Sequence, residues 1–251
     1  MPRVLLITGS SGIAAATAKI ATDAGDSVFL IGNDRTQCEA LSSQLPRSAY
    51  FVTDVSDEPA VAKGVADCIA RTGTIDAAFN VAGLSARRIG DGPLHECSTA
   101  AWNKLMEVHA TGTFFVCREV LRYWMSNKRP GTILNMSSVL ARFPERKHFA
   151  TVAYAASKGA IESMTMSAAS YYAPHKIRLN VLAPGLVRTP MSERAQSDDG
   201  ILEYVKHKQP LKGDLTDAEE VARIAHFLLS DQSFPMTGEI IRADAGWAVT
   251  G

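Results

Sequence analysis

Seven short apolar runs occur along the chain, and segments with helical periodicity separate them. Most runs are apolar at consecutive positions rather than at alternate ones, which is typical of strands buried on both faces. Strands that alternate with helices pair in parallel, and the crossover helices cover both faces of the sheet. The sequence therefore predicts an α/β fold in one domain, residues 1–251, with strands at residues 4–7, 28–31, 50–52, 75–79, 132–136, 177–182 and 239–241.

Charge and cysteine content narrow the class of protein. The 251 residues include 26 basic and 26 acidic side chains, so no net field attracts nucleic acid or a membrane surface. Cys38, Cys68, Cys97 and Cys117 show no metal-binding spacing. The first apolar run is far too short for a secretory leader or a membrane span. We expect a cytoplasmic protein with free thiols, no metal, and a small-molecule partner rather than nucleic acid or membrane.

The turn after the first apolar run has glycine at Gly9 and Gly12, separated by Ser10 and Ser11, and a helix follows from Ile13. Glycines at such a turn let the backbone approach a pyrophosphate, and the helix N-terminus supplies unpaired N–H groups and the positive end of a dipole. The turn predicts a dinucleotide site. The alternative is a tight strand-to-helix turn that binds nothing.

The end of the second run is where such a chain would select its dinucleotide. An acid about 20 residues after the glycine turn binds the adenosine 2′-hydroxyl of NAD, whereas a basic residue accepts the 2′-phosphate of NADP. Gly32 occupies the place expected for the acid, and Asn33 is neutral. Of the next two residues, Asp34 would favour NAD and Arg35 would favour NADP. We expect NAD or NADP, with a slight lean to NADP because the selecting acid is missing and Arg35 lies near.

Small and polar residues also follow the later strands. Asp54 and Val55 follow the third, a turn of small residues from Asn80 to Gly83 follows the fourth, and Ser138 follows the fifth. The carboxyl ends of parallel strands meet at one edge, where open α/β sheets bind ligands. Each could be a plain turn, but together they indicate one crevice.

Tyr154 and Lys158 stand one helical turn apart, so the phenol and the ammonium share a helix face. A nearby cation lowers the pKa of a phenol toward the range useful for proton transfer. Chance also places a tyrosine and a lysine at this spacing. A long helix is expected from residue 99 to about 127, and His109 within it is by default a buried histidine with its hydrogen bonds satisfied.

The chain resembles the short-chain dehydrogenase/reductase family over essentially its whole length. The resemblance rests on the order and spacing of Thr8-Gly9…Gly12, Asp54-Val55, Asn80-Val-Ala-Gly83, Ser137-Ser138, Tyr154-x-x-x-Lys158, Pro184-Gly185 and Thr237-Gly238…Asp244-Ala-Gly246. It implies a single Rossmann-type domain. It also implies an NAD(P)-dependent oxidoreductase that interconverts a secondary alcohol and a ketone by hydride transfer.

The resemblance assigns roles residue by residue. Tyr154 would be the general acid/base and Ser138 would bind the same substrate oxygen, while Lys158 would lower the tyrosine pKa and hold the nicotinamide ribose. A lid at about 188–212 would cover the substrate. The cofactor-binding residues implied are Gly9, Ser10, Ser11, Gly12, Ile13, Asn33, Arg35, Asp54, Val55, Asn80, Ala82, Gly83, Tyr154, Lys158, Pro184, Gly185, Val187 and Thr189.

Three positions depart from the family pattern. The glycine turn has two residues between its first glycines instead of three, and alanine replaces its third glycine. His109 stands where the family commonly has an asparagine of a proton relay, so its catalytic role depends on whether the backbone or the side chain matters. Ala245 replaces a glycine of the C-terminal motif.

Two further expectations concern the substrate and the assembly. Basic residues in loops beside the site, including Arg87, Arg88 and Arg142, would receive an anionic substrate group, or they belong to an ordinary solvated surface. The alternative to an enzyme is a catalytically silent dinucleotide-binding regulator or scaffold of the same fold. Small residues on the helix that follows Tyr154 favour close helix packing, and the resemblance implies a homo-oligomer, expected to be a tetramer.

Overall fold

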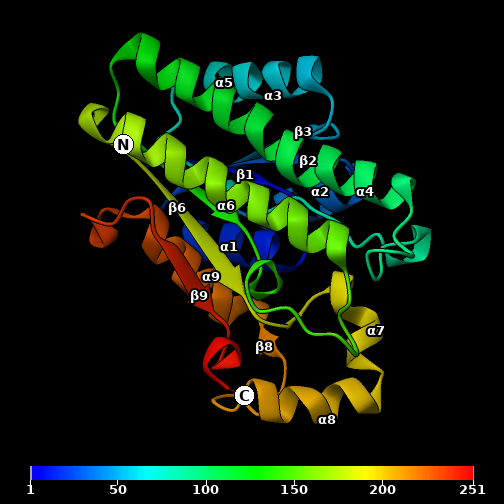
Figure 1. The fold of residues 1–251 in the computed structure, drawn as a ribbon. Coiled ribbons are helices and arrows are strands. Elements are labelled where there is room, and N and C mark those ends of the chain that lie inside the picture. The colour runs from blue at the N-terminus through cyan, green and yellow to red at the C-terminus, as the bar shows by residue number, and fades with distance from the viewer. Residues whose placement is uncertain (1, 251) are drawn as a thin grey trace.

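The computed structural model describes residues 2–250 and contains the predicted seven-stranded parallel sheet (Figure 1). The strand order is β3-β2-β1-β4-β5-β6-β9. The strands are β1 (Val4–Thr8), β2 (Ser27–Gly32), β3 (Ser48–Val52), β4 (Ala77–Asn80), β5 (Gly131–Met136), β6 (Ile177–Pro184) and β9 (Ile240–Ala243). The chain passes from β3 back across β1 to β4, and the carboxyl ends beside this switch point are where a ligand crevice is expected.

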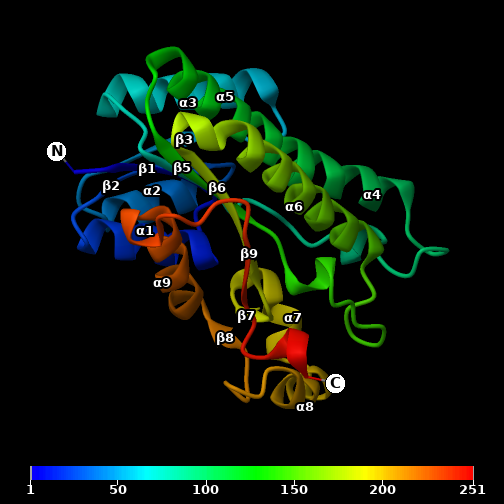
Figure 2. The ribbon, with the colours of Figure 1, turned by 60° about the vertical axis from the view of Figure 1, so that its left-hand side comes forward.

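Helices cover both faces of the sheet (Figure 2). One face carries α1 (Gly12–Asp23), α2 (Arg35–Ser43) and α9 (Ala218–Leu229), and the other carries α3 (Glu58–Thr72), α5 (Gly112–Asn127) and α6 (Val152–Tyr172). Strand β1 shows why its run is continuously apolar. Leu5 and Ile7 pack with α1 and α9, whereas Val4 and Leu6 pack with α3 and α5. Alternate side chains therefore enter two separate cores.

Strand β4 begins two residues later than the sequence predicts. Ile75 is buried, but its carbonyl accepts a hydrogen bond from the Trp124 indole at 2.7 Å. Ile75 is therefore apolar because it packs in the core just before the strand begins, not because it belongs to the strand.

The long helix predicted over 99–127 is interrupted. Helix α4 (Thr99–Leu105) runs into a π-helical turn (Met106–Thr111), and α5 follows directly. A π-turn adds one residue to the helical circuit and is frequent at functional sites. Here it contains His109, which is completely buried.

Two short strands, which the sequence analysis did not predict, lie beyond the carboxyl edge of the main sheet (Figure 2). Strands β7 (Val187–Arg188) and β8 (Thr216–Asp217) pair in parallel, and α7 (Glu193–Gln196) and α8 (Asp199–Lys208) lie between them in sequence. Two residues are too few to show strand periodicity. This pair frames the segment predicted as a lid.

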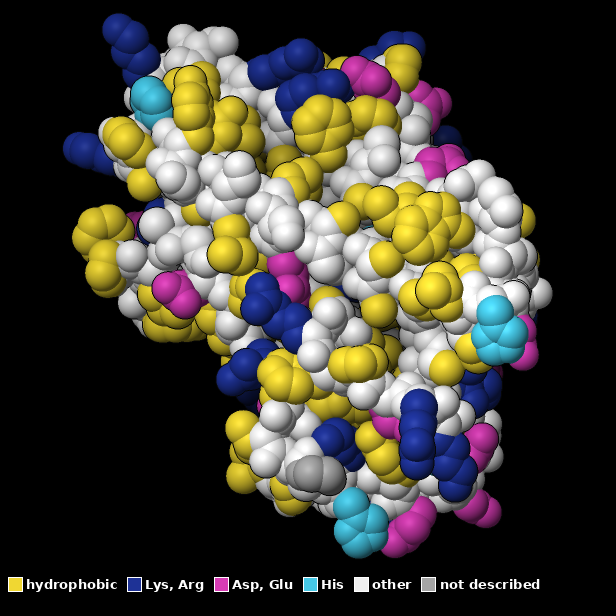
Figure 3. All heavy atoms as spheres, in the orientation of Figure 1, with side chains coloured by type: hydrophobic (Ala, Val, Ile, Leu, Met, Phe, Trp, Pro, Cys, Tyr) yellow, Lys and Arg dark blue, Asp and Glu magenta, His cyan; other side chains and the backbone are white. Residues whose placement is uncertain are grey.

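The surface in Figure 3 shows basic and acidic side chains interspersed, with hydrophobic side chains exposed between them. All four cysteines are free thiols, as predicted. Within residues 2–250, none of the helices combines the length and the apolar character needed to cross a membrane.

Candidate active site

The glycine turn between β1 and α1 has the backbone geometry of a phosphate site. Gly9 and Gly12 have φ of 99° and 54°, in the left-handed region that favours glycine. No side chain caps α1, and its first turn has no acidic residue. A Cβ atom at Gly12 would lie 3.0 Å from Thr189 Cγ2. The helix N-terminus is thus left free for an anion, and the shortened turn is compatible with one.

The turn after β4 is fastened to the first strand. The Thr8 hydroxyl accepts the N–H groups of Val81 and Ala82 at 2.9 and 3.0 Å. A Cβ atom at Gly83 would lie 2.9 Å from His109 Nε2. The absence of a side chain at Gly83 therefore lets this turn lie directly on the buried histidine.

One cavity of about 410 Å³ connects the glycine turn with the tyrosine and the lysine. All four predicted catalytic residues line it, and so do all the predicted cofactor residues except Arg35 and Asn80. The cavity wall also contains residues that the sequence analysis did not single out as site residues, among them Gln37, Lys104, Phe149, Arg194 and Trp247.

Asn80 does not line the cavity, which corrects the prediction. It is the last residue of β4 and lies on the same strand face as Ala78, which packs in the core beside α5. Its amide donates to Asn135 Oδ1 at 2.8 Å and to Cys117 Sγ at 3.2 Å. The period of two in a strand thus turns this side chain into the interior.

Arg35 also lies outside the cavity wall. Its side chain is 68% exposed and faces Glu39, one turn further along α2, at 3.7 Å. Asp34 is occupied as the N-cap of α2, where it accepts the Gln37 backbone N–H at 3.0 Å. Next to Arg35 on the chain, the residues that do line the cavity include Asn33 and Gln37, whose side chains are neutral.

At the other end of the cavity, Ser138, Tyr154 and Lys158 lie together. Ser138 follows β5 and accepts the Leu140 N–H at 3.2 Å, which fixes its hydroxyl. The Lys158 Nζ atom lies 5.7 Å from the centre of the Tyr154 ring and donates to the Met136 carbonyl at 3.0 Å. Lys158 is only 3% exposed.

Burial shifts the pKa values of Tyr154 and Lys158 so that each side chain favours its uncharged form. It raises the pKa of Tyr154 above 10, with the Ser138 hydroxyl acting in the opposite direction. It lowers the pKa of Lys158 to about 7. Burial and the Ser138 hydroxyl account for the shift of the Tyr154 pKa, and the Lys158 Nζ atom donates to a backbone carbonyl. That Lys158 lowers the tyrosine pKa stays a prediction. At neutral pH, Tyr154 therefore retains its proton and can donate it.

His109 has both ring nitrogens engaged. The Leu84 N–H donates to Nε2 at 3.0 Å, and Nδ1 lies 2.9 Å from the Ser157 hydroxyl, which donates to the Tyr154 carbonyl at 2.8 Å. Burial, and secondarily the Lys158 charge, holds the histidine pKa well below 6.5. A neutral ring whose nitrogens are both bonded to protein has no site for a relay water. The side chain instead joins the β4 turn to α6.

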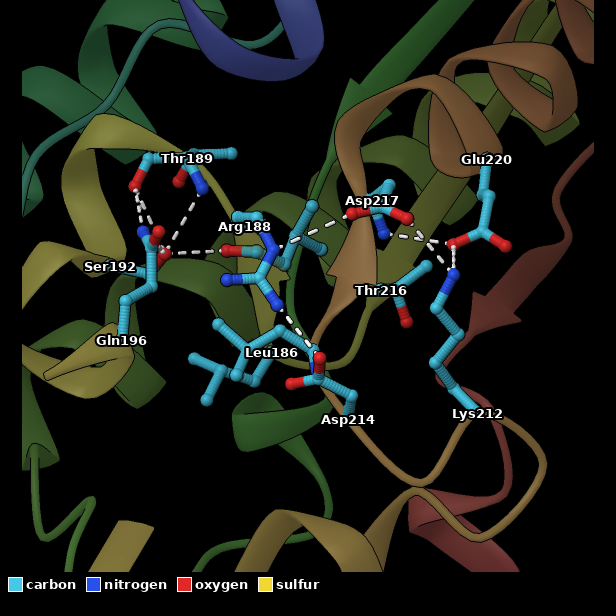
Figure 4. Close-up of polar contacts among 12 residues, drawn as sticks. Leu186, Arg188, Thr189, Ser192, Gln196, Lys212, Asp214, Thr216, Asp217 and Glu220 are labelled. Carbon is cyan, nitrogen blue, oxygen red and sulfur yellow. Dashed lines mark hydrogen bonds and ion pairs between the residues drawn. The ribbon is translucent and has the colours of Figure 1, made fainter. Parts of the chain in front are cut away.

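The predicted lid is anchored at its base (Figure 4). Arg188 contacts Asp214 at 2.8 Å and Asp217 at 3.5 Å, and Lys212 bonds Asp217 at 2.9 Å and Glu220 at 2.8 Å. These contacts tie both ends of the segment, at β7 and β8, to the start of α9.

A family model described as enoyl-(acyl carrier protein) reductase matches residues 7–248, nearly the whole of the chain. The chain belongs to the short-chain dehydrogenase/reductase family. Two curated members of known activity support this. The 2,5-dichloro-2,5-cyclohexadiene-1,4-diol dehydrogenase of Sphingobium indicum is 32% identical over 97% of this chain and 96% of its own. The cis-4-hydroxycyclohexanecarboxylate dehydrogenase of Sinomonas cyclohexanicum is 33% identical over 98% and 96%.

Solved structures of family members agree. Levodione reductase superposes with a TM-score of 0.89 at 28% identity, covering 97% of this chain and 96% of its own. The 3-ketoacyl-(acyl-carrier-protein) reductase of Brucella melitensis, complexed with NADH, has a TM-score of 0.87 at 25% identity and 98% coverage of each chain. This short-chain dehydrogenase/reductase is thus an NAD(P)-dependent oxidoreductase that interconverts a secondary alcohol and a ketone. The comparisons give no support to the catalytically silent alternative.

Proposed function

We propose that Tyr154 is the general acid/base of this reaction, with Ser138 and Lys158 beside it. The observation that carries the proposal is the single cavity that joins these three side chains to the glycine turn. In ketone reduction, Tyr154 donates its proton to the substrate oxygen, and Ser138 donates a hydrogen bond that stabilises the charge developing there. Bound NAD(P)H supplies the hydride. His109 is a positioning residue that holds the β4 turn against α6.

The described residues fit a dinucleotide along the cavity. The turn from Gly9 to Ile13 would hold the pyrophosphate, Asp54 and Val55 the adenine, and Pro184 to Thr189 the nicotinamide amide. Lys158 would donate to the ribose hydroxyls. Residues 188–212 would cover the substrate as a lid.

We further propose a six-membered carbocyclic alcohol or ketone as substrate. The named activities of both curated relatives concern substituted six-membered carbocycles. In this chain Phe149 and Trp247 line the cavity with their ring centres 5.8 Å apart, which supplies an apolar wall for such a ring. A screen of cofactor oxidation over cyclohexanones, open-chain ketones and sugars tests this. Turnover confined to the open-chain ketones or the sugars would contradict it.

The cofactor preference should be weak. The cavity-lining residues between Ile31 and Gln37, where the choice of dinucleotide is expected, include neither a carboxylate to select NAD nor a cation to hold the NADP phosphate, since Asp34 caps α2 and Arg35 lies outside the wall and is paired. The slight lean to NADP therefore loses its main support. We expect dissociation constants of NADH and NADPH within about tenfold, a difference below about 1.4 kcal/mol. Fluorescence titration of both reduced cofactors measures the ratio, and a much larger preference would overturn the expectation.

The oligomer remains a proposal from the sequence and the surface. Trp102 of α4, Phe114 of α5 and Met166 of α6 are each 39–46% exposed, which favours self-association over these helices. Light scattering should show a tetramer, and a monomer would contradict the proposal. The single domain spanning 1–251 and the cytoplasmic location stay predictions.

A further inference from the structure

Two arginines converge at the substrate end of the cavity. Arg87 lies in the short turn after β4, and Arg194 lies in α7 of the lid segment. Both line the cavity wall, and the Nη2 atoms of both donate to the same His148 carbonyl, at 2.5 and 3.2 Å. Because two donors share one acceptor oxygen, the two guanidinium groups lie next to each other.

The pair lacks a close carboxylate partner. Among residues 2–250, no acidic side chain comes within ion-pair distance of Arg87, and Arg194 has only Asp198, at 4.0 Å. Asp91 and Glu145 are the other nearby acids. Asp91 accepts the backbone N–H groups of Ala153 and Tyr154, and Glu145 accepts those of residues 147–149.

The other basic loop residues do not join this pair. Arg142 donates to Glu162 at 2.6 Å and lies outside the main cavity. Arg88, the neighbour of Arg87 on the chain, is exposed. Burial lowers the pKa of Arg87, and the neighbouring Arg194 charge lowers it further. Two adjacent like charges whose one ion pair is the long contact from Arg194 to Asp198 are costly, and a bound anion would relieve that cost.

We propose that Arg87 and Arg194 bind a carboxylate of the substrate. The proposal rests on the proposed function and deepens it, since the ring would lie against Phe149 and Trp247 with the carboxylate on the arginines. The Arg194 Cζ atom lies 6.0 Å from the Phe149 ring centre, so the apolar wall and the cations adjoin. Because Arg194 belongs to the lid segment and Arg87 to the body, the anion would also link the lid to the body.

The test compares matched substrates, 4-oxocyclohexanecarboxylate and the uncharged 4-oxocyclohexanecarboxamide. We expect kcat/KM of the natural chain to favour the carboxylate by about tenfold or more. This ratio should fall toward one in Arg87→Gln and Arg194→Gln, because glutamine keeps a polar amide but carries no charge. Arg88→Gln, one residue away and exposed, should keep the ratio. A ratio near one in the natural chain, or an unchanged ratio in both variants, would overturn the proposal.

Direct binding separates this inference from the proposed function. Calorimetry with saturating oxidised cofactor compares cyclohexanecarboxylate with cyclohexanecarboxamide. If the carboxylate binds more tightly and Arg194→Gln loses this difference, the arginine pair is supported even when neither ketone is reduced. Absence of turnover would contradict only the proposed substrate class. Equal binding of the two compounds would overturn the pair whatever the turnover.

Discussion

Tyr154→Phe should lower kcat for ketone reduction by about 10²–10⁴-fold, the usual contribution of a positioned general acid. Burial raises the pKa of Tyr154 above its ordinary value of 10, so the phenol is protonated over the physiological range, as the proposed proton donor must be. Phenylalanine keeps the ring, its edge-to-face packing on His109 with ring centres 5.4 Å apart, and the fold, but it has no proton to give.

Steady-state kinetics with a cyclohexanone measure this effect, and fluorescence titration verifies that the variant still binds NADH. Tyr171→Phe is the matched control, because Tyr171 lies on the same helix but is 67% exposed. Activity of Tyr154→Phe within a few-fold of the natural chain would refute the acid–base role.

Lys158→Met should abolish most activity and yet stabilise the fold. Lys158 is 3% exposed, and burial lowers its pKa to about 7 from 10.5, which means that the folded state disfavours the charge. Replacing a buried ion pair by apolar side chains of similar volume is often neutral or stabilising by about 1–4 kcal/mol, and we expect the same direction for the buried Lys158 charge. We expect a higher midpoint of thermal unfolding together with a loss of about 10²-fold or more in kcat.

The stabilisation should depend on pH in one direction. Below pH 7 the lysine is charged in both states, so the folded chain bears the full cost of burying it. As pH rises from 7 to 10.5, the unfolded chain binds more protons than the folded one, and the stability of the natural chain increases. The advantage of Lys158→Met should therefore be largest below pH 7 and shrink toward pH 10.5. Exposed Lys63→Met is the control, and a destabilised Lys158→Met would contradict the account.

The fold was predictable because its signals are local. A strand such as β1 that enters two cores must be continuously apolar, and a glycine turn before a helix is visible within five residues. The interruptions were not predictable in the same way. The π-turn preserves the helical apolar pattern on both sides, and β7 and β8 are only two residues each. Ala245 adopts a φ of 48°, which the residues next to it in sequence do not predict.

Site residues were predictable where the position of the backbone determines whether a residue reaches the cavity. They were less predictable where the direction of the side chain determines it. The glycine turn, Ser138, Tyr154 and Lys158 all reach the cavity because the strand ends and the helix register carry them there. The Asn80 side chain points into the core because side chains alternate along a strand. The Arg35 side chain points to solvent and pairs with Glu39 one helical turn away. Arg194 and Trp247 were missed because only the folded chain brings the lid and the C-terminal segment to the cavity.

The central claim is that Tyr154 protonates the oxygen of a ketone whose carbon receives hydride in the same cavity. The most direct measurement is single-turnover reduction of a cyclohexanone by cofactor deuterated at the transferred position, followed by mass spectrometry of the alcohol. We predict one deuterium on the carbinol carbon with the natural chain, and formation of the same product slowed by about 10²-fold or more with Tyr154→Phe. Alcohol without deuterium, or equal rates for the two proteins, would contradict the account.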